Sequence, residues 1–80
     1  MPYITTSLRT QLNEGATPSS PGELNWKITT LLVEYLRGHT VNYGRINDVL
    51  GALEGAKMEF YRRVAVPYEE QKKEQNGDVY

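Results

Sequence analysis

Tyrosine and arginine side chains occur together at several points of this chain, and the combination is suited to binding a small anion that carries a nucleobase. Aromatic rings stack on bases, and a guanidinium group holds a phosphate through two parallel hydrogen bonds. The candidate ligand-binding residues are Tyr43, Arg45, Tyr61, Arg62, Arg63 and Tyr68.

The same tyrosines have a structural interpretation, which we favour over ligand stacking. A tyrosine buries an apolar ring while its hydroxyl stays in water, which suits a small core or an interface between subunits. Arg62 and Arg63 are adjacent, so on a helix they point in different directions, and we expect at most one to share a site with the neighbours of Tyr61. Arg62 also follows Glu59 by three residues, a spacing that predicts a surface ion pair.

No group of residues in the sequence predicts catalysis. His39 is the only histidine and there is no cysteine, so a nucleophile with a positioned base is not available. The glutamates are not accompanied by the Glu-x-x-His spacing of metal sites in helical bundles. We therefore expect a protein that is not an enzyme, with no catalytic residues, no metal site and no cofactor.

Length and charge restrict the partners. A chain of 80 residues makes one domain at most, and it buries only roughly 60% of its unfolded surface, so its core is marginal without another subunit. The net charge of −1 lacks the basic field of a duplex-DNA binder. No apolar run is long enough for a membrane span and no signal peptide is evident. We expect a cytoplasmic homo-oligomer that contacts neither membrane nor duplex DNA.

The N-terminal part, residues 1–22, reads as a short helix followed by a linker. Thr5 or Thr6 is placed to cap a helix within residues 1–13, and the linker EGATPSSPG spans residues 14–22. Ser20, followed by proline and, three residues on, by Glu23, forms a helix-start signature, so the first main helix is expected to begin here.

Residues 23–80 are predicted to form a helical hairpin with a kinked end and a tail. The first helix ends at Gly38, and the second is capped by Thr40 or Asn42 and stops or kinks before Pro67. Apolar residues follow helical spacing in both helices, which predicts one buried face each. These residues are Leu24, Ile28, Leu31, Leu32, Tyr35 and Leu36, and then Ile46, Val49, Leu50, Leu53, Ala56, Phe60 and Val64.

The short connection between the two helices predicts an all-α, antiparallel hairpin, with the N-terminal helix on one side and a second copy on the other. Small residues one turn apart leave bare backbone that another helix can approach. The candidate oligomer interface is Gly51, Ala52, Gly55, Ala56 and the terminal Tyr80. Trp26 lies off the apolar stripe, either packed against the linker or exposed as an anchor for a partner.

Two strings, GELNWKIT and YGRINDVLGALEGAKMEFYRRVAVPYEEQKKEQNGDVY, resemble a family of small uncharacterised proteins from phages and bacteria. The resemblance covers roughly residues 21–80. It rests on a GALE-x-AK-x-E-x-YRR block, a PYE segment and an NGDVY-like end, which match residues 51–57, 61–63, 67–69 and 76–80. The resemblance implies no catalytic residues, and residues 1–20 lie outside it.

Two functions follow from this reading. By analogy with small helical phage proteins that capture nucleotide signals of bacterial defence, the chain is expected to be an oligomeric binder that sequesters a cyclic nucleotide at subunit interfaces. The alternative is a protein-interaction module, either an inhibitor of a host protein or a small virion component, that docks through its helix faces and Trp26.

Overall fold

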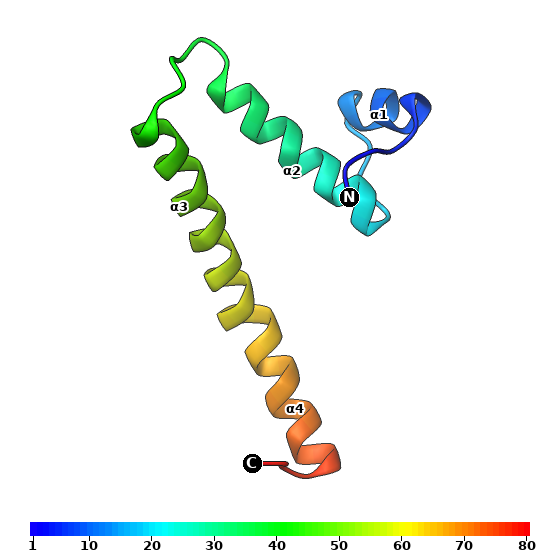
Figure 1. Cartoon of the computed structure of the whole chain (residues 1–80). Helices are drawn as coiled ribbons and strands as arrows, with labels where there is room; N and C mark the ends of the chain where they lie inside the picture. Colours follow the sequence, from blue (N-terminus) through cyan, green and yellow to red (C-terminus); the bar gives the residue numbers. More distant parts are fainter. The chain divides into compact units, whose positions relative to one another are not determined.

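The computed structural model describes all 80 residues, and every regular element in it is helical (Figure 1). The all-α prediction is therefore confirmed. The chain divides into two compact units, residues 1–41 and residues 42–80, which we describe separately. The hairpin pairing of the two main helices, the division of the chain at residue 22 and the assembly into oligomers stay predictions. No helix combines the length and the apolar character needed to cross a membrane.

The first unit contains α1 (Thr6–Asn13) and α2 (Pro21–Leu36), which pack against each other. The Thr5 hydroxyl caps α1 by accepting a hydrogen bond from the Leu8 amide at 3.3 Å. Lys27 of α2 donates to the Leu12 carbonyl at the end of α1 at 2.8 Å, and this carbonyl also accepts from the Gly15 amide at 3.1 Å. The short N-terminal helix that the sequence predicts is thus present and attached to α2.

The start of α2 follows the predicted capping signature. The Ser20 hydroxyl accepts from the Glu23 amide at 3.1 Å, and the Glu23 carboxylate accepts in turn from the Ser20 hydroxyl at 3.1 Å. Pro21 occupies the first turn, where its missing amide hydrogen leaves no bond unmade. The helix ends at Leu36, and Gly38 takes the expected left-handed conformation with φ of 78°.

The core of the first unit consists of Leu12, which is 1% exposed, and Trp26, which is 9% exposed. The interpretation of Trp26 as an exposed anchor is therefore wrong, because its side chain is buried within the first unit. The apolar stripe of α2 has the predicted spacing, but it is not buried: Leu24 is 53% and Leu31 60% exposed. One eight-residue helix covers only one side of α2.

The second unit is one continuous helical segment made of α3 (Tyr43–Phe60), the π-helical turn η1 (Tyr61–Ala65) and α4 (Val66–Asn76). The Asn42 side chain caps α3 by accepting from the Arg45 amide at 2.9 Å, one of the two caps the sequence allowed. Gly77, with φ of 90°, ends α4 as expected.

Pro67 does not end the helix, which corrects the stronger form of the prediction. Proline has no amide hydrogen, and its ring displaces the carbonyl four residues earlier. The segment accommodates this by widening into η1, in which the Val66 amide bonds to the Tyr61 carbonyl five residues back. Backbone angles at Ala65 and Val66 stay helical, so α4 continues from α3 without a break.

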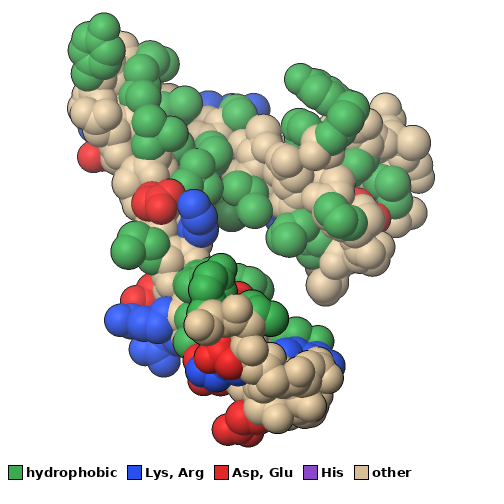
Figure 2. Space-filling model, turned by 60° about the horizontal axis from the view of Figure 1, so that its bottom comes forward, with side chains coloured by type: hydrophobic (Ala, Val, Ile, Leu, Met, Phe, Trp, Pro, Cys, Tyr) green, Lys and Arg blue, Asp and Glu red, His purple; other side chains and the backbone are tan.

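No side chain of the second unit is buried. The apolar residues predicted to form its inward face are exposed in large part: Leu50 by 58%, Phe60 by 66% and Val64 by 51%. Figure 2 shows hydrophobic side chains over large areas of the visible surface. Helix stability in proteins comes mostly from packing of an apolar face, so this segment has surface that a stable fold must cover.

Candidate ligand-binding site

The junction of α3 and η1 holds the densest group of predicted site residues. Lys57, Met58, Glu59, Tyr61 and Arg62 line one surface hollow of about 380 Å³. Tyr61 is 54% exposed and Met58 62% exposed, so an aromatic ring and a flexible apolar side chain are both accessible there. The hollow therefore combines an apolar wall with a guanidinium group, the two features that a nucleotide site needs.

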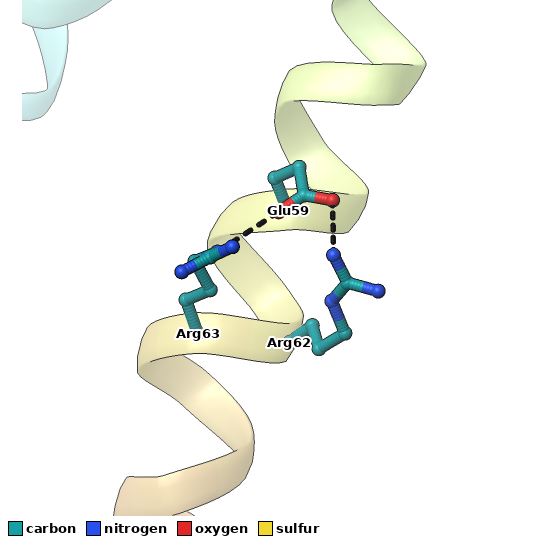
Figure 3. A network of polar contacts seen from close by, with 3 residues as sticks. All are labelled: Glu59, Arg62 and Arg63. Carbon is teal, nitrogen blue, oxygen red and sulfur yellow. Dashed lines mark hydrogen bonds and ion pairs between the residues drawn. The ribbon is translucent and has the colours of Figure 1, made fainter.

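Glu59 holds both adjacent arginines (Figure 3). One carboxylate oxygen accepts from a terminal nitrogen of Arg62, and the other accepts from Nε of Arg63 at 3.1 Å. The predicted pair of Glu59 with Arg62 is confirmed, and the pair with Arg63 was missed although its four-residue spacing is equally favourable. The two arginines thus converge on one carboxylate despite their different directions on the helix.

The two guanidinium groups lower the pKa of the Glu59 carboxyl below its usual value, the hydrogen bond from Arg62 being the larger cause and that from Arg63 the second. The Glu59 side chain is 54% exposed and both arginines are more exposed still, so these ion pairs contribute little to stability. Their effect on the site is mainly geometric. Each arginine uses one of its five N–H donors on Glu59, which leaves donors free for an anion.

Tyr68 is separate from the group at the junction of α3 and η1 and lies on α4. The Lys72 ammonium is 5.6 Å from the centre of the Tyr68 ring, which is a cation–π contact. The four-residue spacing of the two residues is the feature of the sequence that could have predicted this contact. Tyr68 also borders a separate hollow, of about 520 Å³, together with Tyr80 of the tail. Tyr80 is fully exposed and its backbone amide donates to Asp78, so its docking on a neighbouring subunit stays a prediction.

Tyr43 and Arg45 lie at the opposite end of α3 from the other candidates. Tyr43 opens the helix and is 86% exposed, and Arg45 is half-buried in the same first turn. A helix rises about 1.5 Å per residue, so the 16 residues between Arg45 and Tyr61 correspond to about 24 Å. Within one copy, the six predicted residues occupy three separate places instead of one site.

The predicted interface residues of α3 are glycines and alanines, with at most a methyl side chain, and two acidic residues flank them. We call the face formed by Asp48, Gly51, Ala52, Gly55, Ala56 and Glu59 the small-residue face; its members are three or four residues apart and so lie on neighbouring rows of the helix. A Cβ atom added at Gly51 or Gly55 would meet nothing within 4 Å. The face is therefore open along one and a half turns of backbone.

The rest of the chain offers no obvious chemistry. No group of three or more histidine, aspartate or glutamate side chains is placed to hold a metal ion. The ring of His39 lies 5.7 Å from that of Tyr35, centre to centre, which gives it a packing contact in the loop that follows α2.

Comparison with known proteins identifies the family. A family model described as a domain of unknown function, DUF6899, matches residues 1–79, nearly the whole chain. The protein therefore belongs to the DUF6899 family, and the match includes the N-terminal segment that the resemblance seen in the sequence left out. No curated protein and no solved structure matches the chain. The recurring motifs and a phage origin stay predictions.

Proposed function

We propose that this protein is a non-enzymatic, homo-oligomeric binder of a small anionic ligand, with a cyclic nucleotide as the ligand class. In a phage, such a protein would sequester a nucleotide signal of bacterial defence. The observation that supports the proposal best is the group at the junction of α3 and η1, where Tyr61, Met58 and Arg62 border one hollow.

The division of work within this group follows from its geometry. The Tyr61 ring is the surface on which a base stacks, and Met58 adds an adaptable apolar contact. Arg62 binds the phosphate, and Glu59 keeps its guanidinium oriented before the ligand arrives, which lowers the ordering cost of binding. Arg63, on the second oxygen of Glu59, adds positive charge to the same place.

The first test is native mass spectrometry of the protein purified from cells that make a panel of cyclic nucleotides. An oligomer that carries a nucleotide mass in a fixed ratio supports the proposal. A protein with no added mass across the whole panel contradicts it. The ratio of absorbance at 260 and 280 nm gives an independent check, because a bound base raises the signal at 260 nm.

Substitutions then assign the residues. Arg62→Gln removes a charge-assisted hydrogen bond to phosphate, and the expected loss is about tenfold to hundredfold in affinity. Arg37→Gln is the matched control, because this exposed arginine lies in the other unit, at the end of α2. Glu59→Gln removes a negative charge close to the phosphate, while the remaining amide oxygen can still accept the hydrogen bond that orients Arg62. At about 4 Å in water that charge is worth about 1 kcal/mol, so affinity is expected to rise by up to roughly fivefold.

A second candidate, a module that binds another protein, is favoured by the exposed apolar residues of both units. Leu31 of α2 and Leu50 and Phe60 of α3 are each more than half exposed. Large exposed apolar side chains are thus available for protein contact in each unit. This candidate predicts a fixed stoichiometry with a protein and no retained nucleotide, so the mass measurement above separates the two functions.

A further inference from the structure

Lys57 borders the hollow at the junction of α3 and η1, but it has no part in the function proposed above. Its ammonium nitrogen lies 3.7 Å from a carboxylate oxygen of Glu54, and both side chains are more than half exposed. This separation is longer than a hydrogen bond, so the ion pair is loose and the three N–H donors of the ammonium are available. The hollow therefore has a second cation besides Arg62.

Tyr61 and Tyr68 differ in what lies over their rings. Lys72 follows Tyr68 by four residues, and its ammonium lies over that ring. Lys57 precedes Tyr61 by the same four residues, but its ammonium is directed to Glu54, towards the start of α3. No cation lies over the Tyr61 ring. This ring is therefore open to a stacked base while a lysine on a flexible stem lies one helical turn away.

The two cations of the hollow lie on either side of an apolar centre. Each residue advances by about 100° around a helix, so Tyr61 lies about 40° from Lys57 and Met58 about 100° from it. Arg62 follows at about 140°. Glu59 accepts from Arg62 on the side away from Lys57, which holds the guanidinium at that edge (Figure 3). A base on the Tyr61 ring thus has one cation on each side.

We propose that Lys57 is a second phosphate-binding residue of this hollow, which selects nucleotides with phosphate groups at two separate positions of the sugar. This inference rests on the proposed function. One phosphate binds Arg62, and the other replaces the Glu54 carboxylate as the partner of Lys57. The exchange costs little, because an exposed ion pair is worth little. Two phosphates joined in one chain are adjacent, so they engage only one of the two cations.

The test compares two nucleotides that have the same base and the same number of phosphates. Adenosine 3′,5′-bisphosphate carries its phosphates at two positions of the ribose, whereas adenosine 5′-diphosphate carries both in one chain. Isothermal titration calorimetry measures the affinity of the unchanged protein and of Lys57→Gln for each nucleotide. The variant is expected to lose about tenfold in affinity for the bisphosphate, because one charge-assisted hydrogen bond is lost, and less than about threefold for the diphosphate.

Two further variants control for indirect effects. Lys73→Gln is the matched control, because Lys73 also pairs with a glutamate three residues before it but does not border this hollow. Glu54→Gln breaks the ion pair of Lys57 while leaving the ammonium in place. If Lys57 contacts the phosphate directly, Glu54→Gln is expected to bind the bisphosphate as well as the unchanged protein does, or more tightly. Circular dichroism verifies that each variant remains helical.

The outcomes separate this inference from the proposed function. Equal losses for the two nucleotides in Lys57→Gln would overturn the inference, and so would an equally large loss in Glu54→Gln. If Arg62→Gln weakens binding of both nucleotides while Lys57→Gln weakens neither, the inference is wrong and the proposed function stands. If the unchanged protein binds neither nucleotide, the proposed function fails at this hollow, and the role of Lys57 fails with it.

Discussion

The double substitution of Gly51 and Gly55 by alanine tests whether this face of α3 is free or covered by another helix. The change in stability is expected to be a gain if the face is free and a loss if it is covered. A glycine within a helix costs about 0.5–1 kcal/mol relative to alanine. The structure leaves open space at both positions, so in a single copy the double variant is expected to gain about 1–2 kcal/mol. If a second helix packs on this face, each added methyl group overfills the contact at a cost of about 1–3 kcal/mol, which exceeds the gain.

The two effects are measured separately by varying the protein concentration. In dilute solution, the variant is expected to be more helical by circular dichroism and to melt roughly 4–8 °C higher for each kcal/mol gained. In concentrated solution, sedimentation equilibrium is expected to show weaker self-association than for the unchanged chain. Lys57→Ala is the control, because a residue two positions from Gly55 faces another direction. An increase in helicity with unchanged or tighter association would refute the reasoning that this face is an interface.

Four further predictions concern single features. Ser20→Ala removes the cap of α2 and is expected to cost about 1 kcal/mol in a thermal melt, whereas Ser19→Ala, which leaves the amide cap intact, costs less; equal losses would contradict the assignment. Because the pKa of Glu59 is lowered in the folded chain, its ion pairs stabilise the fold at neutral pH and are lost as the pH falls through that pKa. Arg62→Gln is expected to raise the pKa of Glu59 in a carboxyl NMR titration. An unchanged pKa would show that the pair of Glu59 with Arg62 does not form in solution. Pro67→Ala restores an amide hydrogen, so carbon chemical shifts of residues 61–65 are expected to change from π-helical to ordinary α-helical values, and persistence of η1 would require another cause. Deletion of residues 78–80 is expected to weaken assembly, and an unchanged oligomer mass would show that the tail does not dock on a neighbouring subunit.

The ends of the helices could be read from the sequence because their causes are local. Ser20 and Asn42 each accept a hydrogen bond from an amide three residues later, and Gly38 and Gly77 adopt positive φ after the last turn. These interactions need only the residues printed next to one another. Pro67 is the exception, because the sequence cannot say whether a helix with a missing hydrogen bond will stop or will widen by one residue.

Burial could not be read in the same way, because it depends on what packs against each face. Periodicity marked the stripe of Leu24, Leu31 and their neighbours as buried, but none of them is fully buried, and Leu24 and Leu31 are more than half exposed. Trp26, off that stripe, is buried in the unit in which α1 packs against α2. A hydrophobic pattern identifies which faces require a partner, but the position of an eight-residue helix decides which of them is covered within the chain.

The candidate site shows the same distinction between local spacing and packing. Glu59 gathers Arg62 and Arg63 through three- and four-residue spacings, which a sequence displays directly. Arg45 is different, because a continuous helix separates it from Tyr61 by about 24 Å and no change of rotamer brings the two together. Residues of one helix that are so far apart can act on one small ligand only if a second copy brings the distant residue alongside. If the six tyrosines and arginines do serve one ligand, the oligomer is therefore a requirement of the site as well as a way to cover apolar surface.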